Sequence, residues 1–430
     1  MQSILPLAPL PTLQAGDDDV VLRALVVGVR RLKAITFLRL RLPHGFVQAV
    51  CTKPLPDGVR EHASVEVRGT LVPAALKDPA LTHPHLELQV TELELLASPG
   101  APPPFDVSKR TLDAGPEARL DHRPLALRHP TLAATFRVQH VILQAFRAHL
   151  NAAAFTELQT PKLVSTGAEG GADVFVLDYF GRRATLAQSP QFHKEFGTGA
   201  FLRVYEVGPV FRAEKHATSR HLNQYTSLDV ELGPIRDVTE VMALQTGLLR
   251  EICATVQEAC GRELALLGAE VPEVASIPAV PFDEARALIG AGPGDDLAPA
   301  DEAAIGALVK AETGSDFVFV THYPSTKRPF YAMDDPADPT RTVSFDLLFR
   351  GVEITTGGQR IHEAEALVAK LRARGLDPDA FAFFHQVHAY GLPPHGGFGM
   401  GLERLTQHLL GLAQIKDATL FPRDRNRLAP

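Results

Sequence analysis

Residues 211 to 231, FRAEKHATSRHLNQYTSLDVE, combine several charged side chains with a strand-like alternation of apolar residues. Arg212 and Glu214 are two positions apart, so on a strand their side chains would lie on the same face. A guanidinium binds phosphate or carboxylate through a planar fork, and a carboxylate accepts from an exocyclic amine or holds a metal. The alternative is an exposed ion pair worth under about 1 kcal/mol. Taken alone, the stretch fits a ligand site and a solvated surface equally well.

A second segment, HGGFGMGLERL (395–405), favours the ligand site. Its glycines would let the backbone approach a flat ligand closely. Glu403 and Arg404 begin a predicted helix, and the N-terminal end of a helix favours anions. A glycine-rich strand would otherwise be a weak, poorly packed element. We therefore predict that Arg404 reaches a phosphate group.

These segments need a larger fold to position them, and the chain divides at ASPGAPPPFD (97–106). Proline and glycine there prevent both helix and central strand. Five short segments before this break alternate apolar and polar residues, which predicts a small β-barrel within residues 1–103. We expect 104–130 to be a linker or hinge and 131–430 to form the second domain.

The second domain is predicted to be a mostly antiparallel sheet flanked by helices, which makes the whole chain α+β. Helical periodicity and capping residues predict helices at 131–153, 238–261 and 362–375. The glycine-rich segment at 396–411 is expected to pass from strand to helix. Strand-like segments are 157–164, 172–181, 182–187, 200–213, 223–233, 316–324, 329–335 and 342–357.

Composition indicates a globular, non-secreted protein. The chain has 430 residues, 45% of them apolar and 22% charged. It lacks both an apolar run of about 18 residues and a basic leader segment, so we expect a cytoplasmic protein with no membrane partner. The net charge is −7, but eight basic residues face one acid between Arg23 and Arg60. That part of the barrel could follow a phosphate backbone.

Several motifs in order resemble a known family. FRAE with the following RHL, and GxGxGLER, resemble the second and third signature motifs of class II aminoacyl-tRNA synthetases, and TELQTPKLV resembles the first. STGAEGGADVF, AQSPQFHKEF and FRGVEITTGGQR are similar to segments of the short, archaeal-like aspartyl-tRNA synthetases. The resemblance covers nearly the whole chain and likens the barrel to an OB-fold anticodon-binding domain. It implies activation of L-aspartate with ATP, transfer to tRNA(Asp), and a homodimer formed through helix 131–153.

The resemblance also implies roles for single residues. It places Arg212 on the α-phosphate and the substrate carboxylate, Glu214 on the adenine amine, and Arg404 on the γ-phosphate. Arg212 and Arg404 would thus be the catalytic residues, acting by positioning and charge neutralisation. The implied ATP-binding residues are Arg212, Glu214, Arg220, His221, Leu222, Glu353, Gly401, Glu403 and Arg404.

Folded ATP needs a divalent metal with oxygen ligands. Glu353 and Thr356 resemble the family's magnesium (Mg²⁺) pair, with Asp346 assisting; the competing explanation is that the two acids are partners of Arg341 or Arg350. For L-aspartate, the resemblance places Glu169 on the ammonium and Arg360 on the side-chain carboxylate. The implied aspartate-binding residues are Glu169, Gln191, Lys194, Arg212, Thr356 and Arg360.

Selectivity against asparagine would follow from charge. Asparagine cannot neutralise the buried cations Lys194 and Arg360, and an unpaired buried charge costs on the order of 3 to 5 kcal/mol. At about 1.4 kcal/mol per decade, this gives a discrimination of roughly a hundredfold or more.

The resemblance ties the choice of tRNA to the barrel. In relatives it is tied to barrel positions that match Arg30, His83, Pro84 and His85. We expect a non-discriminating enzyme that also charges tRNA(Asn); a discriminating aspartyl enzyme stays open. An asparaginyl enzyme should lack Lys194, and an inactive RNA-binding paralogue should have lost Arg212, Glu353 or Arg404. The sequence departs from the family at Gln224, where glutamate is common.

Overall fold

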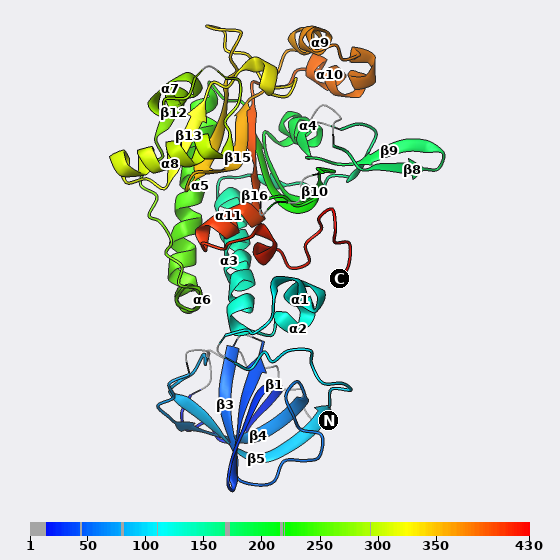
Figure 1. The fold of residues 1–430 in the computed structure, drawn as a ribbon. Helices are drawn as coiled ribbons and strands as arrows, with labels where there is room; N and C mark the ends of the chain where they lie inside the picture. Colours follow the sequence, from blue (N-terminus) through cyan, green and yellow to red (C-terminus); the bar gives the residue numbers. More distant parts are fainter. Residues whose placement is uncertain are drawn as a thin grey trace. The chain divides into compact units, whose positions relative to one another are not determined.

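The computed structural model describes residues 14–43, 45–78, 81–109, 111–167, 173–215, 218, 220–292 and 294–430. The chain folds into two compact units, Met1–Ala133 and Ala134–Pro430 (Figure 1). Among the helices in these ranges, none is long and apolar enough to span a bilayer.

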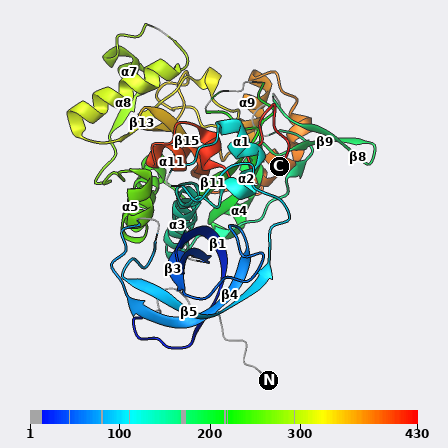
Figure 2. The ribbon, with the colours of Figure 1, turned by 60° about the horizontal axis from the view of Figure 1, so that its bottom comes forward.

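The first unit contains the predicted barrel. Its strands are β1 (Val20–Leu32), β2 (Ile35–Leu42), β3 (Gly45–Cys51), β4 (Ser64–Pro73) and β5 (Leu86–Ala97). They close in the order β1-β2-β3-β5-β4, because β1 pairs with both β2 and β4. Figure 2 shows the ring of strands. Alternate apolar residues fill the interior, as the period of two predicts. The OB-like barrel is therefore confirmed.

The segment predicted as a linker contains two short helices, α1 (Pro116–Asp121) and α2 (Arg123–Ala126). It packs against the barrel within the first unit: Arg39 donates a hydrogen bond to the carbonyl of Ser108, and Arg41 to that of Leu127. A hinge function of residues 104–130 stays a prediction.

The second unit is built on an eight-stranded sheet in the order β12-β13-β14-β15-β16-β11-β10-β6. Its inner pairs are antiparallel, and only the outermost pairs, β12 with β13 and β6 with β10, are parallel. The predicted α+β class is confirmed. The strands are β6 (Thr156–Glu157), β10 (Arg203–Phe211), β11 (Gln224–Leu232), β12 (Ala279–Pro281), β13 (Phe317–Thr321), β14 (Ser344–Phe349), β15 (Val352–Gln359) and β16 (Gly396–Gly401).

Helices α3 (Pro130–Ala152) and α5 (Val238–Ala259) are the two long helices labelled in the second unit in Figure 1. Their apolar side chains belong to the core shared with this sheet. Their spacing explains the packing: Val138, Ile142 and Ala145 recur on one face of α3. The other helices are α4 (Gln191–Phe201), α6 (Gly261–Leu267), α7 (Phe282–Leu288), α8 (Pro299–Thr313), α9 (Ala364–Ala373), α10 (Ala382–Ala389) and α11 (Leu402–Leu409), with short 3-10 turns η2 (Ser325–Lys327), η3 (Pro378–Phe381) and η4 (Ile415–Ala418).

A separate three-stranded sheet consists of β7 (Leu163–Val164), β9 (Arg182–Leu186) and β8 (Val176–Tyr179). Two predicted strands are wrong. Residues 157–164 contribute only the last residue of β6 and the short strand β7, which lie in different sheets. Residues 329–335 form only isolated bridges, at Ala332 and Asp334. Those two bridges anchor an otherwise irregular segment beside β14 and β15.

Candidate active site

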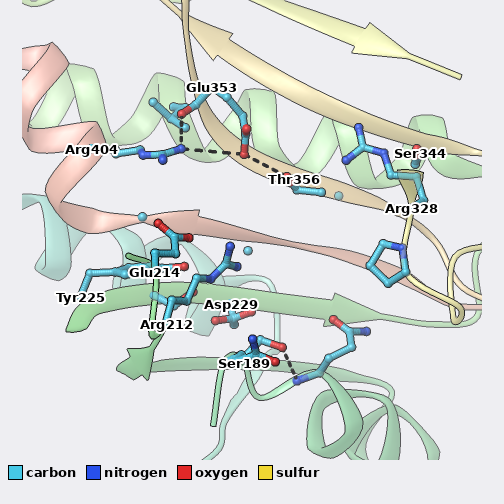
Figure 3. Close-up of a pocket in the computed structure, with 18 of the residues that line it drawn as sticks. Ser189, Arg212, Glu214, Tyr225, Asp229, Arg328, Ser344, Glu353, Thr356 and Arg404 are labelled. Atoms are coloured by element: carbon cyan, nitrogen blue, oxygen red, sulfur yellow. Dashed lines mark hydrogen bonds and ion pairs between the residues drawn. The ribbon is translucent and has the colours of Figure 1, made fainter. Parts of the chain in front are cut away.

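A cavity in the second unit is lined by residues of β11, β15 and β16 and by the first turns of α4 and α11. It collects side chains from segments that are far apart in the sequence (Figure 3). The lining includes Gln191, Lys194, Arg212, Glu214, Arg220, His221, Leu222, Glu353, Thr356, Arg360, Gly401, Glu403 and Arg404, all of them predicted site residues.

The charged hairpin contributes one side of the cavity. Its two strands, β10 and β11, pair antiparallel over their full length. Arg212 and Glu214 follow the end of β10 rather than lying on it, so the premise of a shared strand face was wrong. Asn223 holds their backbone instead, because its side-chain amide donates to the carbonyls of Arg212 (2.7 Å) and Glu214 (3.0 Å). The guanidinium of Arg212 lies 5.9 Å from the ring centre of Tyr225.

The opposite side carries Glu353, Thr356 and Arg404 (Figure 3). Arg404 donates from Nη1 to the carbonyl of Glu353 at 2.9 Å, which fixes its guanidinium beside β15. The Thr356 hydroxyl donates to the Glu353 carboxylate at 3.1 Å. Arg212 and Arg404 therefore enter the cavity from opposite sides.

Glu403, another predicted ATP-binding residue, is held by the backbone of β11. Both of its carboxylate oxygens accept from the backbone N–H of Thr226, each at 3.0 Å. Burial raises the pKa of this carboxyl to about 7, although these hydrogen bonds lower it. Glu403 thus ties the first turn of α11 to β11, and a direct role on ATP stays a prediction.

A buried group of four charges lies at the floor of the cavity; Lys194, Asp229 and Arg360 line it, and Glu231 lies beneath them. Lys194 Nζ lies 2.9 Å from Asp229 Oδ1 and 3.3 Å from Glu231 Oε2, and Arg360 donates to Glu231 at 2.9 Å. Burial would lower the pKa of Lys194, but the two facing acids raise it, so the ammonium stays charged. A Cβ on Gly397 would collide with the backbone carbonyl of Val230 and with the Glu231 carboxylate. That glycine therefore makes room for the neighbouring strand β11 and its buried acid.

This arrangement corrects the charge argument made from the sequence. Lys194 and Arg360 are not unpaired cations, because two acids already balance their charge. Within the described residues, Asp229 Oδ2 is buried without a hydrogen-bond partner, and Glu231 Oε2 has the ion pair with Lys194 but no hydrogen bond. A bound amino acid with an acidic side chain would therefore pair with both signs of charge in this group. Its ammonium would face Oδ2 of Asp229, and its side-chain carboxylate would face Lys194 and Arg360.

The third predicted metal ligand, Asp346, pairs with neither Arg341 nor Arg350. Arg341 pairs with Asp283 and Arg350 with Asp316. Asp346 Oδ2 instead lies 2.7 Å from Arg328, whose guanidinium is 3.9 Å from the ring centre of Tyr323.

The oxygen donors still fit a hard cation. In the described residues, Asp346 Oδ1 is buried and has no hydrogen-bond partner. Burial raises the pKa of Glu353, and the nearby charge of Asp346 raises it further. Two acids that repel each other in this way would gain from a cation between them. The same part of the chain has no group of three or more acidic, histidine or cysteine side chains suited to a metal, so other ligands would have to complete the shell.

Some predicted residues are not in the cavity. Glu169 lies outside the described residues. Arg30, His83, Pro84 and His85 belong to the barrel unit. There, Arg30, Pro84 and His85 are exposed, and the rings of His83 and His85 are 5.7 Å apart. Their role in binding RNA stays a prediction.

Sequence reasoning missed three residues that matter to this geometry: Asn223, Asp229 and Arg328. A signal existed for Asp229, since LDVELG puts two acids at alternate positions of an apolar strand and such acids need buried partners. Nothing local marks Arg328, because its partner Asp346 lies on a different segment.

Comparison with known proteins agrees with this geometry. Residues 115–425 match the family model described as tRNA synthetases class II (D, K and N). The aspartate–tRNA(Asp/Asn) ligase of Thermus thermophilus is 45% identical over 93% of this chain and 94% of its own length. The enzyme of the same name from Deinococcus radiodurans is 44% identical over 97% of each chain. The asparaginyl-tRNA synthetase from Pyrococcus horikoshii, complexed with asparaginyl-adenylate, superposes with a TM-score of 0.87 at 29% identity and 97% coverage of both chains.

Proposed function

Because this chain belongs to the class II tRNA synthetases of the D, K and N group, we propose that it activates L-aspartate with ATP and transfers it to tRNA(Asp) and tRNA(Asn). One observation carries the choice of amino acid. Lys194 and Arg360 lie buried at the floor of the cavity that also contains Arg212 and Arg404. The same cavity thus offers cations to a short dicarboxylic acid and to the phosphates of a nucleotide.

The chemistry follows from positioning. The α-carboxylate of aspartate attacks the α-phosphorus of ATP. The bond between the α-phosphorus and the oxygen that bridges to the β-phosphate breaks, and pyrophosphate leaves. Arg212 would bind both the attacking carboxylate and the α-phosphate, which removes their mutual repulsion. Arg404 would stabilise the negative charge that develops on the leaving pyrophosphate. The terminal ribose hydroxyl of the tRNA then displaces AMP from the adenylate.

Magnesium would be held by Glu353 and Thr356 together with the phosphates of ATP, and Asp346 would assist. Magnesium is commonly bound through one or two carboxylates plus substrate phosphates and keeps several waters. When bound, it would neutralise negative charge on the phosphate oxygens.

Replacing Glu353 with glutamine should raise the Mg²⁺ concentration needed for half-maximal pyrophosphate exchange by about tenfold or more, because a neutral amide is a weaker ligand than a carboxylate. A magnesium titration of exchange at saturating aspartate measures this. Asp316→Asn removes an acid that pairs with Arg350 and is absent from the cavity lining, so it should leave the titration unchanged. Equal half-saturation in Glu353→Gln and the unmodified enzyme would contradict the assignment.

The amino acid is tested by exchange of labelled pyrophosphate into ATP. We expect exchange with aspartate to exceed exchange with asparagine by roughly a hundredfold or more, since only aspartate has a side-chain carboxylate that can compete with Asp229 and Glu231 for Lys194 and Arg360. Exchange with asparagine alone would favour an asparaginyl enzyme. Exchange with neither amino acid would favour an RNA-binding protein without activity.

The range of tRNA is a separate test. The ligases of Thermus thermophilus and Deinococcus radiodurans are both named for tRNA(Asp) and tRNA(Asn), and this supports a non-discriminating enzyme. We expect charging of purified tRNA(Asp) and tRNA(Asn) transcripts with rates within about tenfold of each other. Charging of tRNA(Asp) alone would identify a discriminating enzyme. We also propose a homodimer and a cytoplasmic location, as is usual for such enzymes.

A further inference from the structure

A buried cluster lies behind the part of the cavity wall formed by α4. Glu195 is one helical turn after Gln191 and is completely buried. Its Oε1 accepts a hydrogen bond from the Gln191 side-chain amide at 2.8 Å. Its Oε2 lies 3.2 Å from Nε2 of His395 and 3.3 Å from Nε2 of His388, and both rings are buried. Of these four residues, Gln191 lines the cavity.

The hydrogen-bond partners of His395 determine which of its ring nitrogens carry a proton. Its Nδ1 faces the carbonyl oxygen of Pro393 at 2.8 Å, and a carbonyl only accepts, so Nδ1 carries a proton. Nε2 can then donate to Glu195 only from the doubly protonated, cationic ring. Burial alone would raise the pKa of Glu195, but the facing imidazoles lower it to about 2; burial would lower the pKa of His395, but Glu195 raises it. The carboxylate is therefore ionised and held by a cation.

An ionised Glu195 leaves one orientation for the Gln191 amide. A carboxylate only accepts hydrogen bonds, so the NH₂ group of Gln191 must face Glu195, and the amide oxygen is directed away from it. An L-aspartate molecule has two carboxylates, which accept, and one ammonium, which donates. The oxygen of Gln191 therefore matches only the ammonium.

We propose that Glu195 is a positioning residue for amino acid recognition: it holds the Gln191 amide with its oxygen towards the substrate ammonium, and His395 holds Glu195 in turn. This inference rests on the proposed activation of aspartate. Without an acceptor at position 195, the amide could turn and place its NH₂ group against the ammonium.

Three substitutions test the proposal. Glu195→Met keeps the length of the side chain but removes the acceptor, and Glu195→Asp keeps the charge but withdraws it from Gln191 by one methylene. Each should raise the KM for aspartate by about tenfold, the cost of one hydrogen bond to a charged group. If the Met variant does not fold, the Asp variant tests the same prediction. In Glu195→Gln, the new amide can still accept a hydrogen bond from Gln191 and donate one to a neutral His395. The KM for aspartate of this variant should therefore stay close to that of the unmodified enzyme.

Succinate separates positioning from a merely structural effect, because it is aspartate without the ammonium. Its inhibition constant should stay within about twofold in the Met and Asp variants. Adding Gln191→Met to Glu195→Met should cost nothing beyond Gln191→Met alone, since the two residues act through one contact. Equal losses for aspartate and succinate, or additive effects, would overturn this inference. An unmodified enzyme without aspartate-dependent exchange would overturn the proposed function, and this inference with it.

Discussion

Replacing Arg212 with lysine is expected to lower aspartate-dependent pyrophosphate exchange by about a thousandfold, comparable to losing a group that stabilises transition-state charge. The positive charge survives in this variant, but the planar fork does not. A guanidinium can bridge the substrate carboxylate and the α-phosphate at once, whereas an ammonium acts as a single point charge. The effect should therefore appear in kcat as well as in KM, because the bridged geometry is completed only as the two oxygens approach.

The control for this substitution lies on the strand that leads to Arg212. Arg203 begins β10, is exposed, and donates to the carbonyl of Ala153. Arg203→Lys should retain exchange within about twofold, as is usual for a surface change away from the site. Steady-state exchange at several aspartate and ATP concentrations gives both constants. If Arg212→Lys kept more than about a tenth of the activity, the bridging role would be wrong.

The barrel and the hairpin were predictable because their periodicity is local. In β1, Leu22, Ala24 and Val26 recur at every second position and are buried in the barrel, whereas Arg23 between the first two is exposed. The segment 329–335 misled the prediction, since its apolar residues fill the space next to Phe192 and α9 instead of pairing in a sheet. That packing depends on residues far along the chain.

In the cavity, too, contacts between distant segments could not be predicted from the local sequence. The motifs identified which charged residues gather around the cavity, and the structure does bring Lys194, Arg360 and Arg404 together there. The motifs could not show that Asp229 and Glu231 already neutralise the two floor cations, because these pairs join α4, β11 and the end of β15. We therefore expect selectivity to depend on whether the substrate carboxylate can replace Asp229 and Glu231 as the partner of the two cations, which only the tertiary arrangement reveals.

Substitution of Lys194 by methionine should reduce aspartate activation by at least about a hundredfold while leaving ATP binding nearly unchanged. The substrate loses a buried cation opposite its side-chain carboxylate, and a charge left unpaired in such a site costs about 3 to 5 kcal/mol. Exchange kinetics measure the first effect, and equilibrium binding of ATP measures the second. An unchanged KM for aspartate would remove the proposed role of Lys194.

The same substitution also leaves Asp229 and Glu231 with one cation between them, so the protein should lose stability. A second substitution, Glu231→Gln, restores the balance of charge in the group and keeps Asp229, the acid that would face the substrate ammonium. The double variant should therefore unfold in urea close to the unmodified protein, yet still fail to activate aspartate, because the cation that faces the substrate is absent. Recovery of activity together with stability would mean that Lys194 serves only to neutralise the two acids, and that Arg360 alone recognises the substrate.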